Sequence, residues 1–240
     1  MRTDAAGLPT RAPARPGRTR NGTRRHRPAR SLLATLAVGL ALVLPAPASG
    51  QADEVPIHDP VLIEADSRFY LFGTAPGITV WTSPDLESWR PLPPVFDETP
   101  GWVLELIPEF DHNIWAPDIY EHDGTYYLYY SVSQFGRNGS AIGVATTPTL
   151  DPEDPEFGWT DHGMVLKSVP GRDMWNAIDA HVLHDRDGTP WMSFGSHWGG
   201  IKLVQLDEEL TGVASPPTWR GIAARHRYWK LDERDAGDSA

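Results

Sequence analysis

Residues 115–132 read WAPDIYEHDGTYYLYYSV, and they predict a β-hairpin. The Asp-Gly pair at 123–124 suits a tight turn between antiparallel strands. The run 125–132 that follows is short and aromatic, which is typical of a β-strand. Two similar runs occur at 68–73 (RFYLFG) and 190–195 (PWMSFG), and Pro and Gly punctuate the chain between them. No long apolar pattern with a helical period is present.

The hairpin belongs to a repeat. Asp59, Asp118 and Asp179 head three similar segments, with spacings of 59 and 61 residues. Each segment continues through a hairpin and a third strand, which describes a four-stranded antiparallel blade. We therefore predict an all-β fold, a β-propeller, in which the innermost strands bring the three carboxyls to one mouth of a central channel. A β-sandwich with regular hairpins is the alternative.

The composition excludes several classes of site. The chain has 240 residues, a formal net charge of −11 and no cysteine. Without Cys there are no disulfides, thiolate zinc sites or Cys nucleophiles. Residues 51–240 hold 12 basic and 31 acidic side chains, and this acidic balance argues against a nucleic-acid partner.

Residues 1–50 have a different character, because they hold nine Arg and a single acid. The basic part leads into 13 apolar residues, Leu32–Leu44, and then into the small-residue stretch 45–50 (PAPASG). This order predicts a secretory signal peptide with a long basic n-region, since a membrane-spanning helix needs about 20 apolar residues. We expect a secreted, extracellular protein without membrane contact after cleavage. A buried or membrane-anchoring helix is the alternative, and a twin-Arg signal and an internal start codon stay open.

Three segments resemble glycoside hydrolase family 43: His58-Asp59-Pro60, Trp115-Ala116-Pro117-Asp118 and Asn176-Ala177-Ile178-Asp179. The stretches 127–143 (YLYYSVSQFGRNGSAIG) and 193–200 (SFGSHWGG) are similar to the endo-1,5-α-L-arabinanases of that family. The resemblance implies a five-bladed propeller that hydrolyses α-1,5-linked L-arabinan with inversion, and about three of the five blades are present here.

By position, the resemblance implies roles for two carboxyls. Asp59 matches the general base that activates water. Asp179 matches the acid that orients the other carboxyls and tunes the pKa of the general acid. An inverting glycosidase holds base and acid roughly 6.5–9.5 Å apart, so that water fits between the base and the sugar. Without the repeat, an Asp before Pro60 would be interpreted as a turn cap.

The resemblance also places other residues near the substrate. The candidates for substrate binding are Trp115, Phe135, Gly136, Asn176, Ser196, His197 and Trp198. Aromatic faces pack against the C–H face of a sugar, although packing between blades is the alternative use of the Trp residues. Phe135, next to Gly136 in a polar loop, is expected to face the ligand. His58 and Asp118 are expected to support the catalytic carboxyls.

Residues 214–240 depart from the family pattern. In the family the general acid is a Glu of the fourth blade, followed by a small residue and Pro, whereas Glu233 is the one Glu here and has no Pro after it. A fifth-blade His that helps to hold a central metal ion in the family also has no counterpart, so we predict no metal and no cofactor. The expectation is a family member truncated after the third blade, with blades at 51–213 and an atypical tail at 214–240.

Two functions are therefore open. The first is a secreted glycosidase that acts on plant cell-wall arabinan or arabino-oligosaccharides. The second is a catalytically inactive fragment, either a sugar-binding remnant or a frameshift product, because the general-acid Glu is missing. Exo action and xylan-type substrates also stay open.

Overall fold

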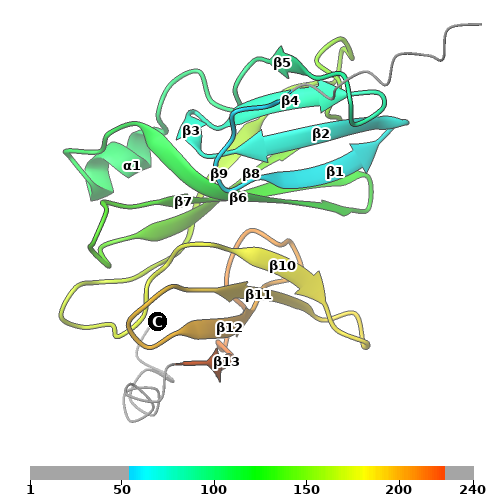
Figure 1. The fold of residues 1–240 in the computed structure, drawn as a ribbon. Coiled ribbons are helices and arrows are strands. Elements are labelled where there is room, and N and C mark those ends of the chain that lie inside the picture. Colours follow the sequence, from blue (N-terminus) through cyan, green and yellow to red (C-terminus); the bar gives the residue numbers. More distant parts are fainter. Residues whose placement is uncertain (1–53, 225–240) are drawn as a thin grey trace, which may run out of the picture. The chain divides into compact units, whose positions relative to one another are not determined.

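The computed structural model describes residues 54–224, and its strands form three antiparallel sheets (Figure 1). The all-β, antiparallel prediction is confirmed. One short helix, α1 (Gly101–Leu106), lies in the sequence between the strands Arg90–Leu92 and Asn113–His122. None of the helical structure within 54–224 has the length and hydrophobicity of a membrane span. The signal-peptide prediction for residues 1–50 lies outside the described residues.

The first sheet has the strand order β1-β2-β4-β5. Its strands are β1 (Val61–Ala65), β2 (Arg68–Gly73), β4 (Thr79–Ser83) and β5 (Arg90–Leu92). Asp66 and Ser67 join β1 to β2 with φ angles of 50° and 61°. Two consecutive positive φ angles are what a tight two-residue hairpin turn requires. Asp59 lies two residues before β1, at the opposite end of this hairpin.

The second sheet has five strands rather than the four expected. They are β3 (Ala75–Pro76), β6 (Asn113–His122), β7 (Thr125–Val132), β8 (Ala141–Thr147) and β9 (Thr160–Lys167). The additional strand, β3, follows β2 in the sequence but pairs with the start of β6, with Ala75 opposite Ile114. It is only two residues long and contains Pro, so no strand signal marks it in the sequence. This short pairing links the first repeat to the second.

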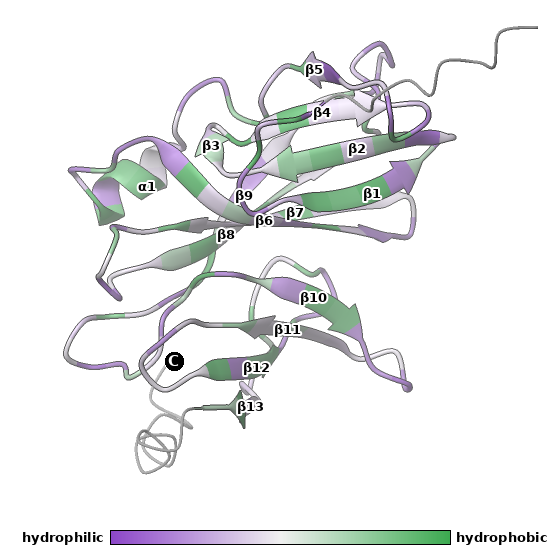
Figure 2. Ribbon diagram, viewed as in Figure 1, coloured by the Kyte–Doolittle hydropathy of each residue, from purple (hydrophilic) through white to green (hydrophobic). Residues whose placement is uncertain are grey.

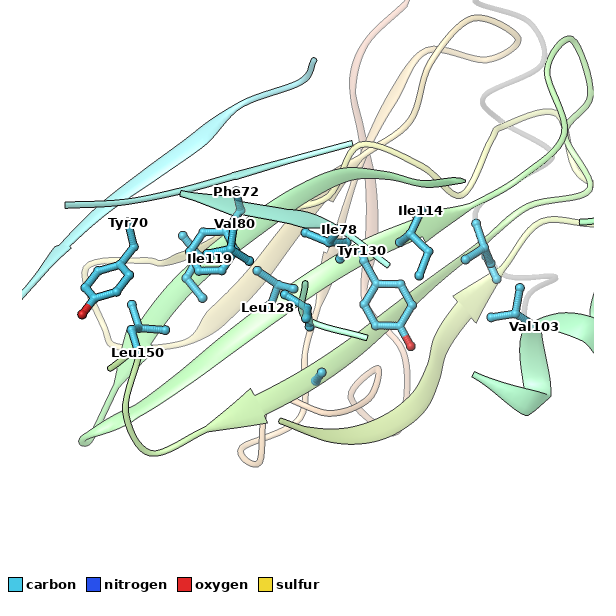
Figure 3. Packing of buried hydrophobic residues seen from close by; sticks show 14 of the residues in the cluster. Tyr70, Phe72, Ile78, Val80, Val103, Ile114, Ile119, Leu128, Tyr130 and Leu150 are labelled. Atoms are coloured by element: carbon cyan, nitrogen blue, oxygen red, sulfur yellow. The ribbon is translucent and has the colours of Figure 1, made fainter. Parts of the chain in front are cut away.

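The aromatic strand β7 explains why the second sheet is buried on both faces. Side chains of a strand alternate between the two faces of the sheet. Leu128 and Tyr130 are fully buried in one hydrophobic cluster, together with Phe72 and Val80 of the first sheet (Figure 3). Tyr129 is buried in a second cluster that includes residues of the third sheet. The predicted hairpin therefore supplies packing to both of its neighbours.

The third sheet consists of β10 (His181–His184), β11 (Pro190–Phe194), β12 (Ile201–Gln205) and β13 (Trp219–Ala223). Its strands carry hydrophobic residues, whereas the turn between β10 and β11 is hydrophilic (Figure 2). β13 lies beyond residue 213, where the sequence analysis ended the blades. It was missed because four of its five residues are exposed and no apolar alternation marks them. Residues 225–240 of the expected tail lie outside the described part of the chain.

Candidate active site

Asp59 lies at the head of the first sheet and is held by a hydroxyl. Thr74, directly after β2, donates a hydrogen bond from Oγ1 to Asp59 Oδ2 at 2.8 Å. The same Thr74 Oγ1 accepts the backbone N–H of Ala116 at 2.9 Å. His58 Nδ1 also lies 2.8 Å from Asp59 Oδ2. Both contacts use one carboxylate oxygen, and no group within residues 54–224 hydrogen-bonds the other oxygen, Oδ1.

Asp179 lies at the head of the third sheet, 120 residues away in sequence, and its carboxyl lies close enough to Asp59 for the charge of Asp59 to act on it. Burial raises the pKa of Asp179, and the negative charge of Asp59 raises it further. The backbone N–H of Asp179 donates to Ser131 Oγ at 3.0 Å, at the end of β7. The site therefore combines a carboxylate that is anchored on one oxygen with a second carboxyl whose pKa is raised.

The two carboxyls occupy equivalent places in their sheets. Asp59 and Asp179 have φ angles of 48° and 59°. The carbonyl before each of them accepts a backbone N–H from the residue directly after the second strand: Thr74 donates to His58, and Gly195 donates to Ile178. This shared geometry places both side chains at corresponding ends of their hairpins.

Asp118 does not share this geometry, which corrects the expectation that three Asp residues head the three units. In the second sheet the positive φ, 40°, belongs to Ala116 instead. The pairing of β6 with β7 shifts register between Trp115 and Asp118, so Asp118 lies inside the strand. A bulge of this kind adds a residue to one strand, so an Asp that recurs at a similar spacing need not occupy the same place in every sheet.

Asp118 instead connects the second sheet to the third. It is 9% exposed, accepts the backbone N–H of Val182 at 2.9 Å, and lies 3.2 Å from His181 Nδ1. Burial raises its pKa despite these two hydrogen bonds. Two residues further along each strand, Tyr120 Oη contacts His184 Nδ1 at 2.6 Å. These contacts join β6 to β10 within a few residues of Asp179.

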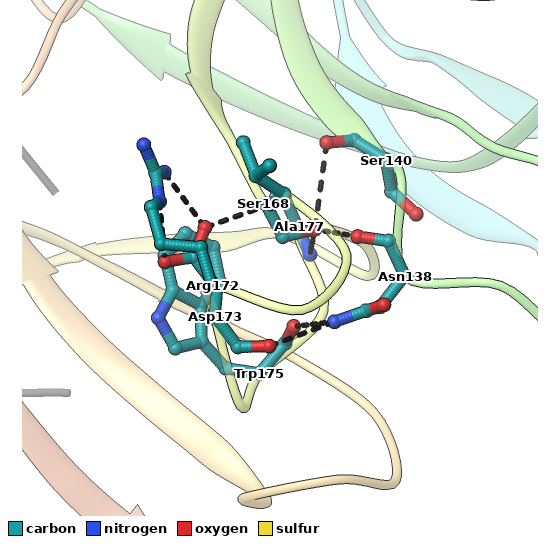
Figure 4. Close-up of polar contacts among 8 residues, drawn as sticks. Asn138, Ser140, Ser168, Arg172, Asp173, Trp175 and Ala177 are labelled. Carbon is teal, nitrogen blue, oxygen red and sulfur yellow. Dashed lines mark hydrogen bonds and ion pairs between the residues drawn. The ribbon is translucent and has the colours of Figure 1, made fainter. Parts of the chain in front are cut away.

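A buried polar network fixes the segment that precedes Asp179 (Figure 4). Asn138 donates from Nδ2 to the carbonyls of Asp173 and Trp175, at 2.9 and 3.2 Å. Ser168 Oγ donates to the Asn138 carbonyl and accepts the N–H of Ala177. Because buried polar groups that are all paired hold a single arrangement, this network fixes the backbone that leads into Asp179.

Asn176 belongs to this network rather than to an open surface. It is 3% exposed, and its Oδ1 accepts a hydrogen bond from Ser140 Oγ at 2.7 Å. Ser140 Oγ in turn lies 2.6 Å from Ser133 Oγ. The side-chain oxygen of Asn176 thus helps to hold the loop, and contact of this amide with the substrate stays a prediction.

The other candidates for substrate binding lie on two loops and one strand. Phe135 follows β7 and is 96% exposed, next to Gly136 with a φ of 77°. The loop between β11 and β12 contains Ser196, His197 and Trp198. In the same loop, Gly199 donates its backbone N–H to the carbonyl of Met174, which connects the loop to the segment before Asp179. Trp115 lies on β6 opposite Ser131 and is partly buried.

Thr74 and Ser131 are the supporting residues that the sequence analysis missed. Thr74 directly follows β2 and Ser131 lies near the end of β7, and the hydroxyl of each contacts the backbone N–H of a positive-φ residue in the next part of the chain, Ala116 or Asp179. A small hydroxyl residue at the end of each aromatic strand was the available signal, and it is visible only once the strand ends are known.

We expect Ser131→Ala to destabilise the protein by about 1–2 kcal/mol, because the N–H of Asp179 loses its acceptor in a partly buried place. Thermal unfolding followed by circular dichroism measures the change. An unchanged melting temperature would show that water replaces the hydroxyl without cost.

We expect Asp179→Asn to stabilise the protein at neutral pH and to do so less as the pH falls. The folded-state pKa of Asp179 is raised, so ionising it costs more in the folded than in the unfolded chain. The contribution of Asp179 to the stability of the wild-type protein is fully present below the pKa that this group has in the unfolded chain. It is lost as the pH rises through the higher pKa that the group has in the folded protein. Asn also tolerates the positive φ at this position. Melting temperatures between pH 3.5 and 7 test this, and an Asn variant whose advantage does not depend on pH would contradict it.

Within residues 54–224 no three His, Asp or Glu side chains lie close enough to hold a metal ion. We therefore derive no step through the central ion that the family resemblance implies. The absence of any cofactor from the whole protein stays a prediction.

Two carboxyls, one of which raises the pKa of the other, are typical of a glycosidase active centre. The sequence pattern of Glycosyl hydrolases family 43 matches residues 54–233. This chain belongs to that family.

Relatives and solved structures agree with the family. An extracellular exo-α-(1→5)-L-arabinofuranosidase of Cellvibrio japonicus is 48% identical over 83% of this chain and 57% of its own length. An extracellular endo-α-(1→5)-L-arabinanase of Bacillus subtilis is 40% identical over 73% of this chain and 55% of its own length. The structure of a Cellvibrio cellulosa α-L-arabinanase complexed with arabinohexaose matches with a TM-score of 0.72 and 47% identity, over 78% of this chain and 59% of that one. The chain thus spans less than two thirds of each of these proteins.

Proposed function

We propose that this protein acts on α-1,5-linked L-arabinan as an inverting glycosidase, with Asp59 as the general base. The observation that carries the proposal is the arrangement of the Asp59 carboxylate. Thr74 and His58 hold its Oδ2, while Oδ1 is left without a hydrogen-bond partner in the described residues. An anchored carboxylate with one open oxygen is suited to take a proton from a water molecule that attacks a sugar.

Asp179 has the second role in this proposal. Desolvation and the nearby charge of Asp59 raise the pKa of Asp179, so this carboxyl takes up a proton more readily than an ordinary aspartate, and when protonated it can donate a hydrogen bond to a neighbouring carboxyl or to a sugar hydroxyl. Ser131 and the network around Asn138 keep its backbone in place. It therefore orients the groups around the anomeric carbon while Asp59 remains the base.

The substrate follows from the named relatives. The Cellvibrio japonicus and Bacillus subtilis proteins are named for α-(1→5)-linked arabinose polymers, and both are named extracellular. By extension we propose a secreted protein with a signal peptide at residues 1–50, acting on arabinan or arabino-oligosaccharides. The three sheets are proposed to be blades of a propeller, in line with the equivalent places of Asp59 and Asp179.

The test is to incubate the purified 240-residue chain with linear α-1,5-arabinan and to follow the release of arabino-oligosaccharides by chromatography. Release that disappears in Asp59→Asn is the expected result for a hydrolase. Release that is unchanged in Asp59→Asn would overturn the assignment of the base.

A second candidate function is arabinan binding without hydrolysis. It is favoured by one observation: within residues 54–224, Asp59 is the one carboxyl whose charge acts on the pKa of Asp179. No other carboxyl of the described residues thus acts on the pKa of Asp179 as a proton donor beside the pair is expected to do. Calorimetric binding of arabinotriose without any product release would favour this function, and release of product would exclude it.

A further inference from the structure

A cavity whose lining includes neither Asp59 nor Asp179 has its own chemical character. It has a volume of about 650 Å³ and is lined by residues 106–109, Gln134, Arg137, Gly139 and 167–170. These residues belong to the end of α1, the turn after β7 and the end of β9. Small-molecule sites in proteins have volumes of about 300–1,000 Å³, so one or two sugar rings fit here.

The cavity gathers positive charge on an acidic protein. Residues 54–224 contain eight Lys and Arg side chains, and two of them, Arg137 and Lys167, line this cavity. Neither has a carboxylate within 4.0 Å among the described residues. Nearby Arg172, in contrast, is paired with Asp173 at 2.7 Å. Glu109 is the one acidic side chain of the lining.

The rest of the lining suits a sugar better than a small inorganic anion. Leu106, Pro108, Val169 and Pro170 supply apolar walls for the C–H face of a ring, and Gln134 supplies an amide for hydroxyl groups. Phe135, between the lining residues Gln134 and Arg137, is 96% exposed and offers a second apolar face at the rim.

The inner wall of the cavity is rigid. Ser168 is 3% exposed, and its hydroxyl donates to the Asn138 carbonyl and accepts the N–H of Ala177 (Figure 4). Val169 donates its N–H to Asp173 Oδ2 at 2.7 Å. A wall whose polar groups are already paired within the protein loses little conformational freedom when a ligand binds.

We propose that this cavity binds a sugar that carries a carboxylate, a hexuronate unit of an acidic polysaccharide, through Arg137 and Lys167. The guanidinium of Arg137 matches a carboxylate with two parallel hydrogen bonds, and the ammonium of Lys167 adds a second positive charge. That the ligand is a sugar rests on the proposed function. That the ligand is negatively charged rests on Arg137 and Lys167 alone, which have no carboxylate partner among the described residues. The site would hold an acidic segment of a polysaccharide apart from the chain that reaches Asp59.

The test is isothermal titration of the full 240-residue chain with sodium trigalacturonate at low ionic strength, with inorganic phosphate and neutral arabinotriose as separate titrants. We expect trigalacturonate to bind, and the double variant Arg137→Gln/Lys167→Gln to weaken it about tenfold or more. Arg186→Gln, which removes an exposed cation from the turn between β10 and β11, is the matched control and should bind as the wild type does. Both variants change exposed side chains, and their melting temperatures check that they fold.

Further outcomes of the titrations test the sugar site independently of the proposed hydrolysis of arabinan. No trigalacturonate binding, or equal binding by the double variant, would overturn the site. Phosphate binding as tight as trigalacturonate binding would overturn the sugar class. Asp59→Asn should leave trigalacturonate binding unchanged, whatever its effect on arabinan, and a loss of binding in that variant would contradict a separate cavity.

Discussion

Asp59→Asn should reduce hydrolysis of a 2,4-dinitrophenyl glycoside of α-1,5-arabinobiose by about 10²- to 10⁴-fold, the range by which a general base accelerates a reaction. The amide cannot take a proton from the attacking water. The dinitrophenolate leaves without protonation, so this substrate measures the base alone and needs no proton donor. The release of dinitrophenolate, followed by absorbance, gives the rate directly.

The chain offers a matched control for this substitution. Asp66 lies at the other end of the same hairpin, is exposed and has a φ of 50°, close to the 48° of Asp59. Asn tolerates the left-handed region in both places, so Asp66→Asn makes the same chemical change in the same backbone conformation. We expect it to keep wild-type activity, and equal losses in both variants would point to a general effect of charge or folding.

Trp175→Ala should destabilise the protein by about 3–5 kcal/mol, since it removes a large aromatic side chain from a packed cluster. Trp175 is 1% exposed, and its ring lies 5.3 Å from that of Phe194 and 5.4 Å from that of Trp219. It therefore joins the segment before Asp179 to β11 and β13. Denaturant unfolding measures the loss, and a change below about 1 kcal/mol would contradict this packing.

Phe135→Ala is the contrast to Trp175→Ala. The Phe135 side chain is 96% exposed, so its removal should leave the free energy of unfolding unchanged. If Phe135 contacts the substrate, the same variant weakens arabino-oligosaccharide binding. The pair of variants thus separates an aromatic ring that stabilises the fold from one that is available to a ligand.

The sequence predicted the antiparallel hairpins because their signals are local. Turn residues such as Asp123-Gly124 and the aromatic strand 125–132 need no knowledge of distant contacts, and β7 forms over that range. Asp59 and Asp179 were likewise found from repeated segments, and the structure gives them the same backbone geometry. Their roles remain predictions.

Features that depend on the pairing of strands were missed or misplaced. The register shift in β6 puts Ala116, and not Asp118, in the place equivalent to the other two carboxyls, and the Asp spacings of 59 and 61 residues show no sign of it. Asn176 is expected near the substrate from the family resemblance; its Oδ1 accepts a hydrogen bond from Ser140, and its contact with the substrate stays a prediction. β13 has an exposed edge, so burial leaves no alternating pattern in its sequence.

The most direct test of Asp59 as the base of an inverting reaction is the configuration of the first product. Proton NMR of the 2,4-dinitrophenyl arabinobioside reaction, recorded before mutarotation, distinguishes the two anomers. Attack of a water molecule activated by Asp59 predicts the β-anomer from the α-glycoside, and its disappearance in Asp59→Asn. An α-anomer as the first product, or a β-anomer that forms equally fast in Asp59→Asn, would contradict the account.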